Sequence, residues 1–141
     1  MKKEIIISII VITMVIIGNI VTQNNTKKTV AKLNEKLANL KNSLIDVIDD
    51  NKKKDENYLK YKEKSSDIRN RWDEMQELLS FYIEHDELEK VETQLAVING
   101  QMESKLYDEA VVEIERCKFI LEHIADKTAF KIGRASCRER V

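Results

Sequence analysis

Residues 30–48 read VAKLNEKLANLKNSLIDVI, and the spacing of their apolar side chains decides the fold class. The intervals are three, four, three, four and four residues, in the series Val30, Leu33, Leu37, Leu40, Leu44 and Ile48. Because such intervals match the turn of an α-helix, these side chains lie on one stripe that must pack against other helices. The stretch therefore predicts a helix with a heptad-like seam, beginning near Thr26.

Three further stretches carry the same helical spacing. They comprise, in chain order, Tyr61, Ser65, Ile68, Trp72, Met75, Leu79 and Tyr82; Leu88, Val91, Leu95, Ile98 and Met102; and Tyr107, Ala110, Ile114, Cys117, Leu121 and Ile124, with Ser65 the one polar seam position. The chain has no proline and three glycines, which disfavours tight hairpins and phosphate-binding loops. The sequence predicts an all-α, up-down bundle of about four helices over residues 26–128.

Breaks between these helices are expected at three places. Residues 49–55 are polar throughout and suit a turn, the apolar stripe changes phase at His85–Asp86, and Gly100–Lys105 marks a softer break. Asp86 followed by Glu89 resembles a capping box at a helix start. A stack of helix pairs is the alternative architecture, because residues 106–110 resemble the second helix of a tetratricopeptide repeat, although no repeating period accompanies them.

An uncharged apolar stretch, IIISIIVITMVIIGNIV, occupies Ile5 to Val21. Its nine isoleucines and three valines favour membrane insertion by about 4 to 7 kcal/mol. At about 1.5 Å per residue the stretch spans roughly 25 Å, close to the hydrocarbon core of about 30 Å. Residues 1–22 are therefore predicted to be a membrane anchor that contacts the lipid bilayer through Ile5 to Val21.

A cleaved signal peptide is the competing interpretation, since it shares the basic start and apolar run. Residues 22–25 offer no small-x-small cleavage pattern, and Thr29–Ala31 is a poor late site, so we expect a retained anchor. Lys2 and Lys3 oppose a group of lysines within residues 27–36. Because the four residues before the apolar stretch are easily retained on the cytoplasmic side, we expect a single-pass protein of the cell membrane with an extracytoplasmic domain.

The last ten residues, Ile132 to Val141, resemble a translated sequencing adapter, ATC GGA AGA GCG TCG TGT AGG GAA AGA GTG. The adapter begins two bases earlier with AG, which allows only Lys, Gln or Glu at position 131, and Lys131 stands there. A native basic tail is the alternative. We expect residues 132–141 to be an artefact, in which case the native chain beyond Lys131 is unknown and Cys117 is its one cysteine.

The charges nearly balance, with 24 basic and 25 acidic residues. This balance indicates salt-bridged helix surfaces rather than the clustered positive charge of a nucleic-acid-binding protein. Because the sequence contains no nucleophile elbow, P-loop or paired zinc motif, we expect neither an enzyme nor a cofactor. Trp72 and Cys117 fall on seams, where we expect core packing rather than a ligand pocket or a reactive thiol.

Two histidines follow glutamates, His85 in Glu84-His85-Asp86 and His123 in Glu122-His123. Each is expected near the end of its helix, the second and the fourth, and these helices run parallel in an up-down bundle. Two imidazoles with neighbouring carboxylates are metal ligands, so these five residues are candidates for a metal site. The alternative is that each histidine caps the negative end of its helix.

Three stretches together resemble one bacterial family. They are the apolar anchor, the tryptophan-bearing helix ending Tyr82-Ile83-Glu84-His85-Asp86-Glu87-Leu88, and Cys117-Lys118-Phe119-Ile120-Leu121-Glu122-His123-Ile124. Over nearly all of residues 1–128 the chain is similar to domain-of-unknown-function family four-three-six-three. The resemblance implies a short, N-terminally anchored helical protein and assigns no activity.

These features support two hypotheses of function. The first is a membrane-anchored structural or interaction protein at the bacterial envelope, which presents charged helix faces to a protein partner. The second is a sensory or metal-binding module that uses the histidine end of the bundle. The sequence identifies neither the partner nor the oligomeric state.

Overall fold

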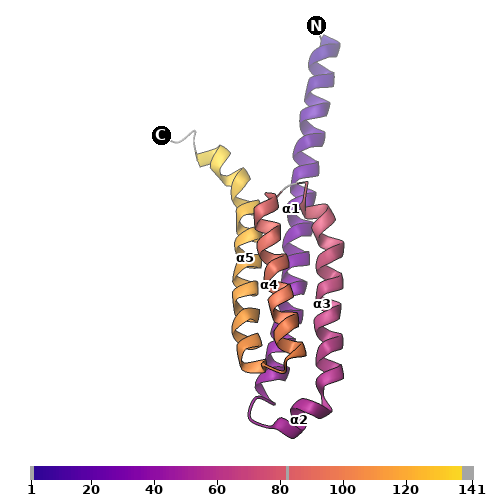
Figure 1. Ribbon diagram of the computed structural model, residues 1–141. Helices are drawn as coiled ribbons and strands as arrows, with labels where there is room; N and C mark the ends of the chain where they lie inside the picture. Colours follow the sequence, from indigo (N-terminus) through magenta and orange to yellow (C-terminus); the bar gives the residue numbers. More distant parts are fainter. Residues whose placement is uncertain (1, 82, 138–141) are drawn as a thin grey trace.

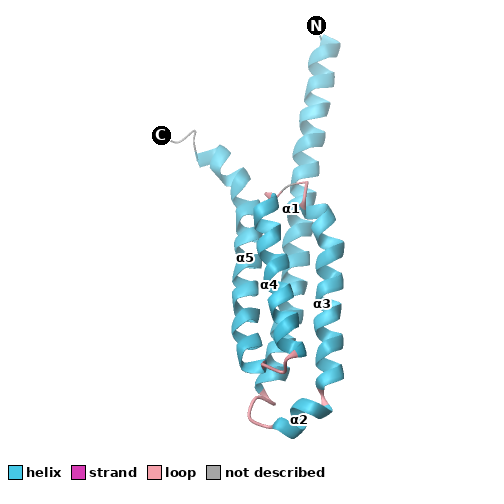
Figure 2. Cartoon of the chain, in the orientation of Figure 1, coloured by secondary structure: helices cyan, strands magenta, loops and turns pink. Residues whose placement is uncertain are grey.

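The computed structural model describes the backbone of residues 2–81 and 83–137 and, except at residues 51, 52 and 129–137, their side chains. The helices in these ranges are α1 (Lys2–Ile45), α2 (Asn51–Glu56), α3 (Tyr58–Leu79), α4 (His85–Glu103) and α5 (Tyr107–Cys137). The described part of the chain contains no strand (Figure 2). The four long helices alternate in direction, with α1 and α4 each packed against α3 and α5 (Figure 1). The predicted all-α bundle is confirmed.

The predicted stripes form the core of this bundle. Trp72 and the leucines of α1 from Leu33 to Leu44 are fully buried, and the third and fourth stripes are buried at every position. Ser65 is buried at its seam position, as predicted, whereas Tyr82 lies outside the described residues. At one end of the core the rings of Tyr61 and Tyr107 meet edge to face, with centroids 5.6 Å apart. The heptad-like spacing therefore identified the core correctly.

The first stripe departs from prediction at its last residue. α1 ends at Ile45, and the backbone turns as the Val47 amide donates to the Leu44 carbonyl oxygen at 3.0 Å. The turn changes the direction of the following side chains, so Val47 is buried and Ile48 only half-buried. Ile48 still packs against the core, as its place on the stripe predicted, although the helix expected to carry it ends at Ile45.

The polar stretch at residues 49–55 contains a short helix rather than only a turn. Asp50 is the N-cap of α2, and its side chain accepts a hydrogen bond from the Lys53 amide at 3.1 Å. The same segment is held from the other side of the bundle, because Asp55 pairs with Lys105 in the α4–α5 connection. Local capping and this distant ion pair together stabilise a helical turn that composition alone does not indicate.

α4 begins at His85, which agrees with the predicted change of phase. Its N-cap is Glu84, without a side-chain capping bond, so the predicted Asp86 capping box is absent. At the other end of α4, Lys105 has a φ of 56°. The Leu106 amide donates to the Gln101 carbonyl oxygen at 2.9 Å, which is the pattern of a Schellman helix end. The third predicted break is therefore a tight, defined turn.

α1 joins the predicted anchor and the first bundle helix without interruption. The polar residues between them stay helical, and the Thr26 hydroxyl donates to the Thr22 carbonyl oxygen at 2.9 Å. The predicted anchor at residues 1–22 and the first bundle helix, expected from Thr26, are thus parts of one continuous helix of 44 residues.

The far end of the chain is also helical. The predicted stripe of α5 is buried as far as its last residue, Ile124, and the backbone helix runs on to Cys137, within the segment interpreted as adapter sequence. Residues 138–141 of that segment lie outside the described residues.

Candidate functional site

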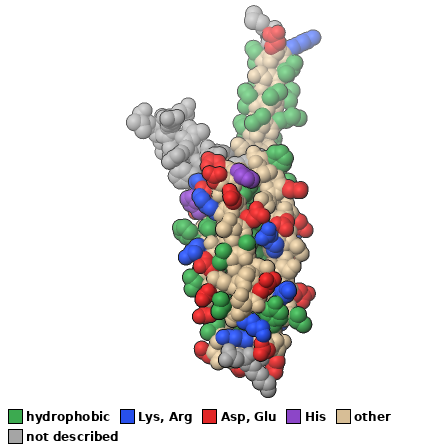
Figure 3. All heavy atoms as spheres, in the orientation of Figure 1, with side chains coloured by type: hydrophobic (Ala, Val, Ile, Leu, Met, Phe, Trp, Pro, Cys, Tyr) green, Lys and Arg blue, Asp and Glu red, His purple; other side chains and the backbone are tan. Residues whose placement is uncertain are grey.

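The projecting part of α1 is covered with apolar side chains (Figure 3). All the large apolar residues from Ile5 to Val21 are at least half exposed, and Met14 reaches 71%. This helix is long and apolar enough to cross a membrane, and its most apolar stretch is not buried inside the protein. The core helix of a soluble protein would be mostly buried, whereas a signal sequence shares both the composition and the position near the N-terminus.

The bundle begins immediately below this projection, at what we call the anchor end. Thr22 and Gln23 are half-buried, and Thr26 and Val30 are buried. The α3–α4 connection lies at this end of the bundle (Figure 1), where α3, which packs against α1, ends at Leu79. It carries Phe81, which is 79% exposed and so places an aromatic ring at the surface.

A charged cluster ties α4 to α5 at the same end. Glu87, in the first turn of α4, is buried except for 9% of its surface. It accepts hydrogen bonds from Lys127 of α5 at 2.9 Å and from Lys90 at 3.3 Å. The hydrogen bond from Lys127 lowers the pKa of the Glu87 carboxyl against the opposing effect of burial. This nearly buried carboxylate is thus paired with two lysines, and its bond to Lys127 forms a clamp between α4 and α5.

Both predicted histidines lie at the anchor end of the bundle. The Glu87–Lys127 bond brings the start of α4, where His85 stands, beside the turn of α5 that follows His123. Both histidines are exposed. Among the described residues, no group of three or more histidine, cysteine, aspartate or glutamate side chains is placed to hold a metal ion. Glu84, Asp86 and Glu122 complete no such set.

Neither histidine stands where a helix-capping role requires. His85 is the first residue of α4 rather than the last of the preceding helix, because α3 ends at Leu79. His123 lies within α5, which continues to Cys137. A histidine at the start of a helix faces the positive end of its dipole, so the predicted C-terminal capping by His85 was wrong.

Trp72 and Cys117 lie in the core, as expected from their seam positions. Both are fully buried. Burial raises the pKa of the Cys117 thiol to about 12, so it is protonated at neutral pH and poorly nucleophilic. The indole Nε1 of Trp72 has no hydrogen-bond acceptor among the described residues. The tryptophan is therefore held by its apolar contacts alone.

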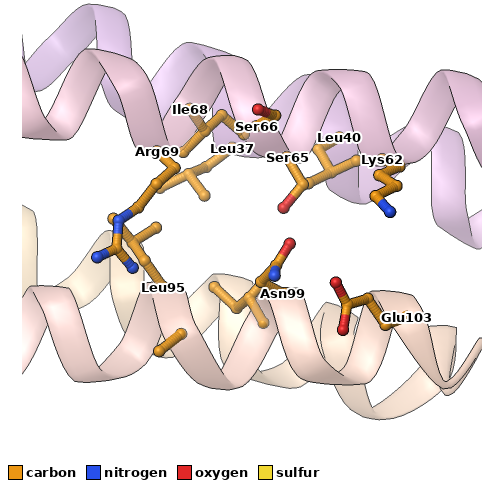
Figure 4. A pocket seen from close by; sticks show the side chains of 12 residues that line it. Leu37, Leu40, Lys62, Ser65, Ser66, Ile68, Arg69, Leu95, Asn99 and Glu103 are labelled. Carbon is orange, nitrogen blue, oxygen red and sulfur yellow. The ribbon is translucent and has the colours of Figure 1, made fainter.

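A groove of about 350 Å³ runs between α3 and α4, with Leu37 and Leu40 of α1 beneath it. The small side chains Ser65 and Ser66 leave this space, and Lys62, Arg69, Asn99 and Glu103 surround it (Figure 4). Arg69 is already paired with Glu92 of α4 at 3.2 Å. Sequence reasoning missed this groove because it arises from the separation of two helices, and the one local signal was the serine at a seam position.

Comparison with known proteins identified one family. A family model described as "Domain of unknown function (DUF4363)" matches residues 20–134, which cover the bundle and the end of the apolar stretch. No curated protein matches the chain. No solved structure matches it either.

Proposed function

The chain belongs to the DUF4363 family, and we propose that it is a membrane-anchored, non-enzymatic interaction module whose bundle binds a protein partner at the bacterial envelope. The observation that carries this proposal is the continuity of α1, whose exposed apolar half leads without a linker into the core of the bundle. A protein built in this way has no flexible spacer between its bundle and the bilayer.

The energetics of the apolar half favour a transmembrane position. Ile5 to Val21 carry no charge, and a helix of that length extends about 25 Å, slightly less than a hydrocarbon core of about 30 Å. Lys2 and Lys3 flank one end of this stretch, and Lys27 and Lys28 are exposed just past the other. Lysines in these positions reach the headgroup phosphates on the two sides.

The lysines before the apolar stretch support an extracytoplasmic bundle. Lys2 and Lys3 favour the cytoplasmic side for the end of the helix that carries them. The face of the bundle seen in Figure 3 carries both acidic and basic side chains. Interhelical pairs such as Lys41–Glu115 at 2.6 Å leave many other charged side chains exposed. Such a mixed surface suits a protein partner better than a nucleic acid.

Membrane extraction of the native chain tests the anchor. The protein should resist carbonate and high salt and dissolve only in detergent. Ile9→Asp/Ile12→Asp should release it, because each aspartate costs about 2.5 to 3.5 kcal/mol at the helix centre, where an isoleucine had favoured insertion. Val112→Asp is the matched control, since Val112 is 58% exposed and Ile12 is 56% exposed. If the wild-type chain dissolves in carbonate, the anchor is refuted.

A search for a partner tests the interaction role separately. Cross-linking in intact cells should join the bundle to a defined envelope protein through exposed lysines such as Lys60 of α3. The product should disappear with the double aspartate variant and persist with Val112→Asp. If the cross-linked products are the same for the anchored and the released chain, the partner does not depend on the membrane and the proposed role is wrong.

A further inference from the structure

We propose that the α3–α4 connection is a second membrane contact, in which Phe81 enters the headgroup layer of the same bilayer that holds α1. This inference rests on the proposed anchoring and adds a lipid-binding surface on the bundle itself. It follows from the height at which the structure places Phe81, from the exposure of its ring, and from the absence of a linker in α1.

Two contacts between α1 and α3 determine that height. Lys36 of α1 pairs with Asp67 of α3, and Lys64 of α3 donates to the Ser43 hydroxyl at 2.8 Å. The helices are antiparallel, and each rises about 1.5 Å per residue. Counting residues along both helices from the Lys36–Asp67 pair places Phe81 level with Thr22. The same count from the Lys64–Ser43 contact places Phe81 level with Thr26. Ser80 keeps helical backbone angles, so the count extends to Phe81 with little change.

The level of Phe81 coincides with the polar layer of a bilayer. Val21 is the last residue of the apolar stretch, and Thr22 to Thr26 lie about 2 to 8 Å beyond it along the helix. The headgroup region on each side of the hydrocarbon core is roughly 5 to 8 Å thick. Because α1 is straight and unbroken here (Figure 1), the connection cannot be held far from the membrane by a flexible spacer.

The side chains at this position suit the membrane–water interface. Phe81 is 79% exposed, and Leu78, one turn earlier, is 60% exposed. Aromatic and apolar side chains are stabilised at the boundary between headgroups and acyl chains. Glu77 and Glu84 are exposed beside them, so this contact is not an attraction to anionic lipid. The fitting partner is the apolar part of the interface of a zwitterionic bilayer.

A second contact changes what the anchor does. A single transmembrane helix allows the bundle to tilt in any direction, whereas contacts on α1 and on the α3–α4 connection define a preferred side. The bundle would then keep one face toward the membrane and leave the membrane-distal end, near α2, directed into the aqueous space.

Spin labelling of the full chain in phosphatidylcholine nanodiscs tests the proposal. The parent carries Cys137→Ser, and its remaining Cys117 is buried and should take up no label. Labels are placed by Ser80→Cys beside Phe81, by Leu59→Cys at the far end of α3, and by Ile12→Cys in the anchor. Leu59 is a matched reference because it is 77% exposed and about 30 Å away along the helix. Accessibility to oxygen and to a water-soluble nickel chelate is then measured.

We expect the label at position 80 to be several-fold less accessible to the nickel chelate than the label at position 59. Adding Phe81→Ser should remove most of this difference, whereas Phe119→Ser, which changes a ring that is 71% exposed on α5, should leave it unchanged. If positions 80 and 59 are equally accessible while position 12 is shielded, the anchor stands and the second contact is refuted. If position 12 is also accessible to the chelate, the anchor and the contact are both refuted.

Discussion

Replacing Trp72 tests how the bundle is held together. The side chain is fully buried in α3 and packs against the core. Trp72→Ala removes the largest buried side chain, and large-to-small changes of this kind cost about 3 to 5 kcal/mol. A domain of this size has roughly 5 to 15 kcal/mol of stability in total. We therefore expect the substitution to remove about a fifth or more of the free energy of unfolding of the bundle.

Trp72→Phe separates apolar packing from hydrogen bonding at the same position. It deletes the indole Nε1, which has no acceptor among the described residues, and keeps one six-membered ring. A buried donor without an acceptor costs about 1 to 3 kcal/mol, so its removal offsets part of the lost packing. The net cost of Trp72→Phe should be under about 1.5 kcal/mol, well below that of the alanine variant.

The assay is denaturant unfolding of the full chain in detergent micelles, followed by far-ultraviolet circular dichroism. The denaturant slope should be unchanged while the midpoint falls for alanine and moves little for phenylalanine. An unchanged midpoint for Trp72→Ala would mean that the tryptophan is exposed and available for binding. Equal losses for both variants would show that the indole donor is hydrogen-bonded and that the stated reason is wrong.

The remaining predictions concern the anchor end and the tail. Glu87→Gln should cost about 1 to 2 kcal/mol of stability at neutral pH. Because the pKa of Glu87 is lowered in the native state, this stability is present above the unfolded value of about 4.5 and is lost as pH falls through the native pKa, so wild type and variant should become equally stable in acid. A stability difference between them that stays constant across pH in melting experiments would exclude the ion pair. Zinc should not raise the melting temperature of the protein. His85→Ala and His123→Ala should each change stability by under about 0.5 kcal/mol, and their effects should add. Strong energetic coupling between the two substitutions in the presence of zinc would establish a metal site. Deletion of residues 132–141 should leave the unfolding midpoint unchanged, and re-sequencing should give other codons there; the same ten codons in an independent genomic read would establish the tail as native.

The core was predictable because burial in a helical bundle repeats at short intervals along the chain. Leu33, Leu37 and Leu40 needed only their spacing to be placed, and the polar Ser65 was correctly included because its neighbours fixed the phase. The continuity of α1 was also within reach, because residues 22–25 contain polar side chains but no proline or glycine to end a helix. The prediction of a boundary between residues 22 and 26 relied on the polarity of these residues, and polar side chains alone do not end a helix.

Other features depend on contacts that no local pattern contains. Asp55 of α2 pairs with Lys105, fifty residues away. The clamp at Glu87 needs Lys127 from another helix. The sequence of the first turn of α4, taken alone, therefore does not distinguish Glu87 from any other acidic residue. The height of Phe81 beside the anchor depends on how α3 is aligned with α1. Alignment between helices is set by packing, and the sequence of one helix does not reveal it.

The intact mass of the protein recovered from carbonate-washed membranes tests the central claim most directly. If Ile5 to Val21 is a retained anchor, the membrane fraction should contain a chain that begins at Met1, with or without the usual processing of that methionine. A mature chain that begins near residue 23 or 32 and is found free of the membrane would show that the apolar stretch is a cleaved signal sequence. That result would contradict the anchored bundle and every conclusion drawn from its position at the bilayer.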